Sequence, residues 1–179
     1  MIRIATESDA ESIIEIRKGI ILSENTTKFF LSSPNNIPVD VNKEQEKINT
    51  SQSKGNLNIV FEVDDQVIGF LVFYRFEQER LRHAGTLGMG IKEEYCNQGI
   101  GTKLIQDLLK WATKQNGLEK ICLGVVSVNE RAMKLYKRMG FAEEGRQRNQ
   151  IKYEDGTYAD DLLMAYYLGD KISTRNGRN

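Results

Sequence analysis

Residues 89–109, which read MGIKEEYCNQGIGTKLIQDLL, constrain the fold more than any other part of the chain. The segment 83–92 has the composition of a β-strand, and Gly99 and Gly101 lie in the turn that follows it. After this turn apolar residues recur with helical spacing, at Leu104, Ile105, Leu108, Leu109 and Ala112. A strand, a glycine-rich turn and a helix N-terminus together form an anion site, because unpaired backbone N–H groups and the helix dipole point at one place. A tight turn that binds nothing has the same pattern, so both interpretations stay open at this point.

Composition restricts the class of protein. A chain of 179 residues with 40% apolar and 28% charged residues is typical of one globular domain. Lys and Arg together number 25, as do Asp and Glu, so the net charge favours neither nucleic acid nor an anionic membrane. No apolar run approaches the roughly 20 residues of a membrane span, and the polar start of the chain differs from a signal peptide. We therefore expect a cytoplasmic protein.

Metal and disulfide chemistry are not expected. Cys96 and Cys122 are too few and too far apart for a disulfide framework or a metal cluster, and the chain has one histidine. Any chemistry must then use carboxylates, hydroxyls, backbone amides or a bound cofactor.

The order of predicted elements indicates one α/β domain over residues 1–169, built on a mixed sheet, with a flexible tail at 170–179. A strand at 83–92, a helix from Gly101 and a near-continuous apolar strand at 119–128 form a βαβ unit, so these strands should be parallel. The other predicted elements are a strand at 2–5, a helix that begins at a Ser8–Glu11 capping box, a polar helix at 42–53, strands at 57–63 and 67–76, a helix at 129–139, and a terminal hairpin of 141–153 and 158–168.

The helix at 129–139 carries the second informative motif. Asn129 and Tyr136 are seven residues apart, which is two helical turns, so their side chains lie near one line about 10 Å apart. The simplest interpretation is that Asn129 caps the helix and Tyr136 packs in the core.

Together the two motifs resemble those of the Gcn5-related N-acetyltransferases (GNAT family). The family's acetyl-CoA motif, Gln/Arg-x-x-Gly-x-Gly/Ala, corresponds to Cys96-Asn97-Gln98-Gly99-Ile100-Gly101. Its later motif, Asn-x-x-Ala-x-x-x-Tyr-x-x-x-Gly-Phe, is matched by Asn129, Ala132, Tyr136, Gly140 and Phe141. The order of elements also matches over residues 1–168. The C-terminal part, with Glu144-Gly145, Tyr158, Asp160 and Met164, is loosely similar to the branch that holds spermidine and ribosomal-protein alanine N-acetyltransferases.

The resemblance implies an acetyl-CoA-dependent N-acetyltransferase with a GNAT-like fold. The pyrophosphate of the cofactor would bind backbone amides of 98–102, and the pantetheine arm would bind the backbone of Met89 and Ile91, with Asn129 on its other side. An amine would attack the thioester directly in a ternary complex, and Tyr136 would protonate the departing thiolate. The residues expected to bind the cofactor are Met89, Gly90, Ile91, Asn97, Gln98, Gly99, Ile100, Gly101, Thr102, Asn129 and Tyr136.

Two positions depart from the family pattern. Cys96 stands where Gln or Arg is usual, so one phosphate contact is lost or replaced; without a neighbouring histidine we expect an incidental thiol and not a nucleophile. Thr86 stands where many members carry a glutamate on the central strand, and it cannot act as a base. The candidates for that role are Glu62, Glu77, Glu79 and His83.

The acceptor is a small-molecule amine or a protein amino group, and the sequence does not choose between them. We expect residues 23–40, 77–82 and 146–158 to frame its pocket. The carboxylates that could attract a cationic amine are Glu77, Glu79, Glu154, Asp155 and Asp160. A homodimer could form through the edge of the terminal hairpin.

Two other functions compete with this one. A non-catalytic acyl-CoA-binding regulatory module would explain the missing strand glutamate. A nucleotide- or dinucleotide-binding protein could use Gly99 and Gly101, but Lys103 and Leu104 follow where a third fingerprint glycine would lie, and no Gly-Lys-Ser/Thr is present.

Overall fold

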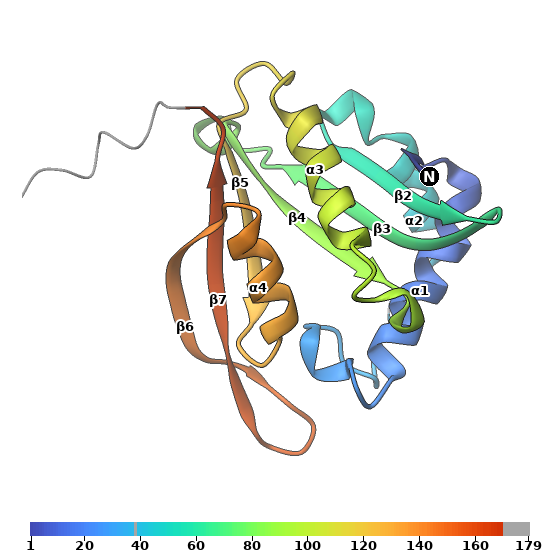
Figure 1. Ribbon diagram of the computed structural model, residues 1–179, viewed down its shortest axis with the longest axis vertical. Helices are drawn as coiled ribbons and strands as arrows, with labels where there is room; N and C mark the ends of the chain where they lie inside the picture. The colour runs from blue at the N-terminus through green and yellow to red at the C-terminus, as the bar shows by residue number, and fades with distance from the viewer. Residues whose placement is uncertain (38, 170–179) are drawn as a thin grey trace, which may run out of the picture.

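A single mixed sheet organises the protein (Figure 1). The computed structural model describes residues 1–37 and 39–169, and the predicted tail at 170–179 lies outside them. Within these residues seven strands are ordered β1-β2-β3-β4-β5-β7-β6. Their bounds are β1 Ile2–Ile4, β2 Leu57–Val63, β3 Gln66–Arg75, β4 Ala84–Ile91, β5 Lys120–Val126, β6 Ala142–Lys152 and β7 Tyr158–Tyr167. Neighbouring strands are antiparallel except β4 and β5, which are parallel as the βαβ pattern predicted.

Helices cover both faces of the sheet. Helices α1 (Ala10–Leu22) and α2 (Val41–Asn49) lie behind it in Figure 1, and α3 (Ile100–Ala112) and α4 (Glu130–Arg138) lie in front. On the α3 side, Leu104, Ile105 and Leu108 are fully buried against strand residues such as Phe73. On the α1 side, the apolar stripe of α1 packs on β2 and β3. The two buried helix stripes give the sheet a core on each face.

The start of α1 differs from the predicted capping box. The structure forms the box two residues earlier, around the short helix η1 (Glu7–Asp9), where the Asp9 carboxylate accepts the backbone N–H of Thr6 at 2.7 Å. Arg3 fixes this arrangement, because its guanidinium pairs with the same carboxylate at 2.7 Å. The prediction of Ser8 and Glu11 was therefore wrong, since the ion pair to β1 selects Asp9 as the capping side chain.

The central strands part after a short region of pairing. Strand β4 pairs with β5 only at Ala84–Lys120, Gly85–Ile121 and Thr86–Cys122. On its other edge β4 stays paired with β3 as far as Ile91. From Leu87 onward the edge of β4 toward β5 has no strand partner in the described chain, so a gap opens in the middle of the sheet.

The backbone of β4 points specific groups into this gap. Backbone groups of successive strand residues point to alternate edges. Just before the strand begins, the carbonyl of His83 accepts the backbone N–H of Lys120, the first residue of β5. Just after it ends, the backbone N–H of Lys92 donates to the carbonyl of Ile68 in β3 at 2.9 Å. Odd-numbered residues therefore face β5, and beyond Leu87 these are Met89 and Ile91.

Candidate functional site

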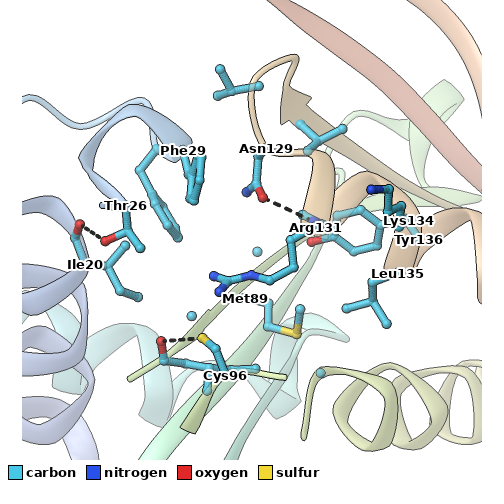
Figure 2. A pocket seen from close by; sticks show the side chains of 18 of the residues that line it. Ile20, Thr26, Phe29, Met89, Cys96, Asn129, Arg131, Lys134, Leu135 and Tyr136 are labelled. Carbon is cyan, nitrogen blue, oxygen red and sulfur yellow. Dashed lines mark hydrogen bonds between the residues drawn. The ribbon is translucent and has the colours of Figure 1, made fainter. Parts of the chain in front are cut away.

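The gap between β4 and β5 opens into a pocket of about 770 Å³. It is lined by β4, the turn before α3, the end of β5, α4 and the segment after α1 (Figure 2). Every residue predicted to bind a cofactor lines this pocket except Gln98. The Gln98 side chain is turned back, and its Nε2 donates to the carbonyl of Glu94 at 3.1 Å. The structure thus brings together the two motifs that the sequence separates by some thirty positions.

The turn before α3 depends on left-handed backbone. Asn97 and Gly99 have φ of 62° and 80°, values at which glycine carries no steric cost. Gly101 is needed for space instead, because an added Cβ would lie 2.8 Å from Cδ2 of Leu135 in α4. With α4 packed this closely, the first N–H groups of α3 are presented at the pocket wall.

A row of cations on α4 lies opposite this turn. Arg131, Lys134 and Arg138 recur at helical spacing and all line the pocket. The Arg138 guanidinium reaches the start of α3, where it donates to Oγ1 of Thr102 at 3.2 Å. We call these three residues the basic stripe. Sequence reasoning missed it, although the i, i+3, i+7 spacing was visible, because charged residues on a helix usually face solvent.

Arg131 extends across the pocket toward Cys96 (Figure 2). Burial raises the pKa of the Cys96 thiol, and nearby Arg131 opposes this with a smaller effect. The thiol contacts the carbonyls of Ile91 and Lys92 at 3.9 and 3.6 Å. A protonated, partly buried thiol without a base is unsuited to nucleophilic attack, which supports the expectation of an incidental thiol.

Asn129 and Tyr136 both lie at the pocket wall on α4 (Figure 2). The Asn129 side chain caps the helix, since its Oδ1 accepts the N–H of Ala132 at 3.1 Å. Its amide N–H groups have no partner among the described residues. The Tyr136 ring is buried and packs on Phe141 with 5.6 Å between ring centroids, and its hydroxyl reaches the pocket. Burial raises the pKa of Tyr136 to about 12, so the hydroxyl keeps its proton at every physiological pH.

None of the four candidate bases lines the pocket. Glu62 is held by Arg3 at 2.7 Å on the β1–β2 side of the sheet. Glu77, Glu79 and His83 precede β4 and lie at its N-terminal end, whereas the pocket runs along its C-terminal half. The expectation that residues 77–82 frame the pocket was therefore wrong, because the strands separate only after Thr86.

The segment after α1 spans the gap. Residues 23–31, which we call the bridging loop, include the short helix η2 (Thr27–Phe29). The loop is tied to the turn before α3 through Ser23 and Asn25, which donate to the Glu93 carboxylate at 2.8 and 2.9 Å. The loop and the turn before α3 therefore form one continuous rim of the pocket.

The bridging loop is also tied to the terminal hairpin. Lys28 pairs with Asp155 at 2.8 Å, and the Tyr153 hydroxyl donates to the carbonyl of Lys28 at the same distance. From the predicted segment 23–40, Thr26, Phe29, Phe30 and Leu31 line the pocket. No residue of 146–158 lines it, so the hairpin contacts the bridging loop and does not itself frame the pocket as predicted.

A further carboxylate lies in the pocket that the sequence did not single out. Asp161 of β7 pairs in register with Val126 of β5, and both line the pocket. Burial raises the pKa of Asp161. Its neighbour Asp160, which was among the predicted carboxylates, instead accepts the N–H of Asn149 and pairs with Arg146. Adjacent side chains of a strand point to opposite faces of the sheet. Without the register of β7, the sequence could not show which of these two aspartates faces the pocket.

The pocket therefore has two walls of different character. The basic wall consists of the β4 edge, the turn before α3 and the basic stripe of α4. The acidic wall consists of Phe29–Leu31, Gly124, Val126 and Asp161. Within residues 1–37 and 39–169 no group of three or more His, Cys, Asp or Glu could hold a metal ion, and no helix is long and apolar enough to cross a membrane.

The sequence model of the acetyltransferase (GNAT) family matches residues 24–141, which include both motifs. The chain belongs to this family. Among its relatives, an N-alpha-acetyltransferase of Sulfurisphaera tokodaii is 30% identical over 92% of this chain and 90% of that protein. An L-amino acid N-acetyltransferase of Escherichia coli is 26% identical, but only 58% of this chain and 63% of that protein align. A ribosomal protein bS18 alanine N-acetyltransferase of Haemophilus ducreyi is 26% identical over 66% of this chain and 78% of that protein, in line with the loosely predicted branch.

Solved structures share the fold. A GNAT acetyltransferase of Streptococcus pneumoniae superimposes with a TM-score of 0.85 and 24% identity, over 93% of this chain and 98% of that one. A Salmonella typhimurium acetyltransferase, solved with its cofactor acetyl-CoA, has a TM-score of 0.83 and 20% identity over 95% of this chain and 94% of that one. The predicted GNAT-like fold is confirmed. Dimerisation through the hairpin edge stays a prediction.

Proposed function

We propose that this GNAT-family protein is an acetyl-CoA-dependent N-acetyltransferase that moves the acetyl group directly to an amine in a ternary complex. One observation supports this most strongly: an unpaired strand edge, a helix N-terminus, a row of cations and a buried tyrosine all face a single pocket. Such a pocket suits a ligand that carries phosphates at one end and an amide-rich arm at the other.

The phosphates of acetyl-CoA bind between the turn before α3 and the basic stripe. Backbone N–H groups of 98–102 supply donors, and the helix dipole favours negative charge there. Cys96 provides no phosphate-binding side chain where the family usually has Gln or Arg, and Arg131 extends from α4 toward that position. We assign Arg131 to the missing phosphate contact, because a guanidinium forms paired hydrogen bonds with phosphate oxygens.

The pantetheine arm extends the sheet along β4. Its amides bond with the backbone of Met89 and Ile91, which point into the gap, and the arm thereby takes the place of a strand. The N–H groups of Asn129 face it from α4, while Oδ1 of the same side chain caps the helix.

The reaction needs no covalent enzyme intermediate. The amine lone pair forms a bond to the thioester carbon, the C–S bond breaks, and the sulfur takes the proton of Tyr136. The amide nitrogen gives its extra proton to solvent, from which Tyr136 regains one. A backbone N–H of β4 stabilises the negative charge that develops on the carbonyl oxygen. Because such a reaction needs acetyl-CoA, we propose a cytoplasmic location.

Calorimetric titration separates this proposal from its alternatives. Acetyl-CoA should bind, whereas NAD and ATP should bind at least tenfold more weakly, because neither has an arm to pair with β4. Release of CoA in the presence of a panel of primary amines then tests for transfer. Tight acetyl-CoA binding without transfer to any amine would favour the regulatory module, and preferential binding of ATP or NAD would refute the proposal.

A further inference from the structure

Among the described residues, Asp161 is one of two carboxylates that line the pocket, and the other, Glu130, pairs with Lys134 at 3.3 Å. The carboxylates that the sequence offered for binding an amine are engaged or lie outside the pocket: Asp155 pairs with Lys28, Asp160 pairs with Arg146, Glu154 does not line the pocket, and Glu77 and Glu79 lie beyond the other end of β4. The Asp161 carboxylate has no hydrogen bond or ion pair with any described residue. A carboxylate left unpaired in a pocket is unfavourable unless a ligand supplies the counter-charge.

The position of Asp161 keeps it away from the basic wall. In β5 and β7, Leu123, Val125, Leu162 and Met164 belong to the core that includes Tyr136. Asp161 pairs with Val126 and so lies on the opposite face, toward the bridging loop, whose η2 contacts β5. The carboxylate and the row of cations thus approach the gap from opposite faces of the sheet.

Gly124 of β5 leaves space for the Asp161 carboxylate. A Cβ on Gly124 would lie 2.9 Å from Oδ2 and 3.0 Å from Oδ1 of Asp161. Glycine at this point of β5 allows the Asp161 side chain to lie along the strand at the pocket. The φ of Gly124 is not positive, so glycine is needed here to leave space for the carboxylate and not to allow an unusual backbone conformation.

Apolar side chains of the bridging loop line the same pocket as Asp161. Phe29 and Leu31 of the bridging loop line the pocket, and Leu31 is 72% exposed. An exposed leucine beside a pocket is suited to contact with an apolar ligand. The acidic wall therefore combines one negative charge with apolar surface.

We infer that Asp161 binds the ammonium group of the acceptor, a primary amine that is cationic at neutral pH and attached to an apolar body that contacts Phe29 and Leu31. This inference rests on the proposed function. The ammonium transfers one proton to the carboxylate, which is partly exposed and passes it to water, and the freed lone pair attacks the thioester carbon. The sulfur leaves with the proton of Tyr136. As the amide forms, its nitrogen loses its extra proton to solvent and Tyr136 regains one from there, so the only proton released overall is the one that the ammonium gave to Asp161. The raised pKa of Asp161 supports this role, because it makes the carboxylate a better proton acceptor.

Two acceptors of similar shape and different charge test the inference. 2-Phenylethylamine is a cation at pH 7.5, whereas phenylacetic hydrazide is neutral, so only the first needs a counter-charge and a proton acceptor. In Asp161→Asn, kcat/KM for 2-phenylethylamine should fall about 10- to 100-fold, the range for loss of a charged hydrogen bond. With the hydrazide it should change less than about threefold.

Matched variants separate charge from structure. Asp160→Asn removes the same charge from the neighbouring residue, whose carboxylate faces away, and should leave the ratio between the two acceptors unchanged. Gly124→Ala keeps the charge but displaces the carboxylate, and should raise KM for the cationic amine selectively. Thermal melting checks that each variant is folded.

Each outcome decides the inference. Equal losses for both acceptors in Asp161→Asn would reduce Asp161 to a structural role. A wild-type protein that binds acetyl-CoA and acetylates other amines but not 2-phenylethylamine would refute the assigned acceptor class. Failure to bind acetyl-CoA would instead refute the proposed function itself.

Discussion

The two walls of the pocket differ in charge, in construction and in how visible they are in the sequence. The basic wall is formed by consecutive motifs on β4, the turn before α3 and α4. The acidic wall is assembled from the bridging loop, one glycine of β5 and one aspartate of β7, which are spread over more than a hundred positions of the chain. The difference suggests a division of labour: the basic wall holds an anionic cofactor, and the acidic wall selects a cationic acceptor. Variants that act on one wall should therefore leave the other substrate unaffected.

The largest effect is expected from Tyr136→Phe, because the hydroxyl acts where the two substrates react. We expect kcat to fall about 10- to 1000-fold, or about 1.4 kcal/mol for each factor of ten, since the departing thiolate loses its proton donor. The dissociation constant of acetyl-CoA should stay nearly the same in calorimetry, because the ring still packs on Phe141. An unchanged kcat, with chemistry shown to limit turnover, would exclude Tyr136 from the mechanism.

Arg131→Ala should weaken the basic wall alone. The affinity for acetyl-CoA should fall about tenfold or more, and its dependence on salt should become less steep, because one phosphate contact is lost. KM for the amine, measured at saturating acetyl-CoA, should not change. Lys137→Ala is the matched control, since this cation lies on the same helix, is exposed and does not line the pocket. Equal effects of the two variants would indicate general electrostatic attraction and not a specific contact.

Lys28→Ala should act on the acidic wall, and only modestly. Lys28 and Asp155 are each about half exposed, at 49% and 50%, and exposed ion pairs contribute roughly 0–1 kcal/mol. Without the pair the bridging loop is held less firmly to the hairpin, so KM for the amine should rise about two- to fivefold while acetyl-CoA binding stays constant. A larger effect on acetyl-CoA than on the amine would contradict the division between the walls.

Apart from the basic stripe, the basic wall could be predicted because its signals are local. Left-handed backbone at Gly99 and close packing at Gly101 require glycine at fixed positions in a single turn. Asn129 caps the helix on which Tyr136 lies two turns later, so motif and element coincide. The order of elements along the chain and the parallel βαβ unit followed from the same kind of local pattern.

The acidic wall could not be predicted because it depends on register and on strand separation. Nothing in the sequence shows that β4 and β5 part after Thr86, and this separation decides which loops reach the pocket. Because of this separation, residues 77–82 lie outside the pocket. Likewise, Asp160 and Asp161 are chemically identical in the sequence, and only the pairing of Asp161 with Val126 places it in the pocket.

The smallest effect is expected on stability, and it tests whether Asp161 is unpaired. Burial raises the pKa of Asp161 in the folded protein. A group with a raised folded-state pKa contributes stability that is present below its unfolded pKa, about 3.9, and is lost as pH rises through the folded value. The charged carboxylate therefore costs stability at neutral pH, and Asp161→Asn should raise Tm slightly at pH 7, with the gain shrinking as pH falls toward 4.

The matched change at the neighbouring position should have the opposite sign. Asp160 accepts the N–H of Asn149 at 2.8 Å and pairs with Arg146 at 3.2 Å, so Asp160→Asn should lower Tm at pH 7. The cations that line the pocket lie on α4, in the basic wall, and burial alone accounts for the raised pKa of Asp161. A lower Tm for Asp161→Asn at pH 7 would mean that the carboxylate already has a stabilising partner in the free protein. In that case the acidic wall would have no unpaired charge to offer an acceptor, and the contrast between the two walls would rest on the basic stripe alone.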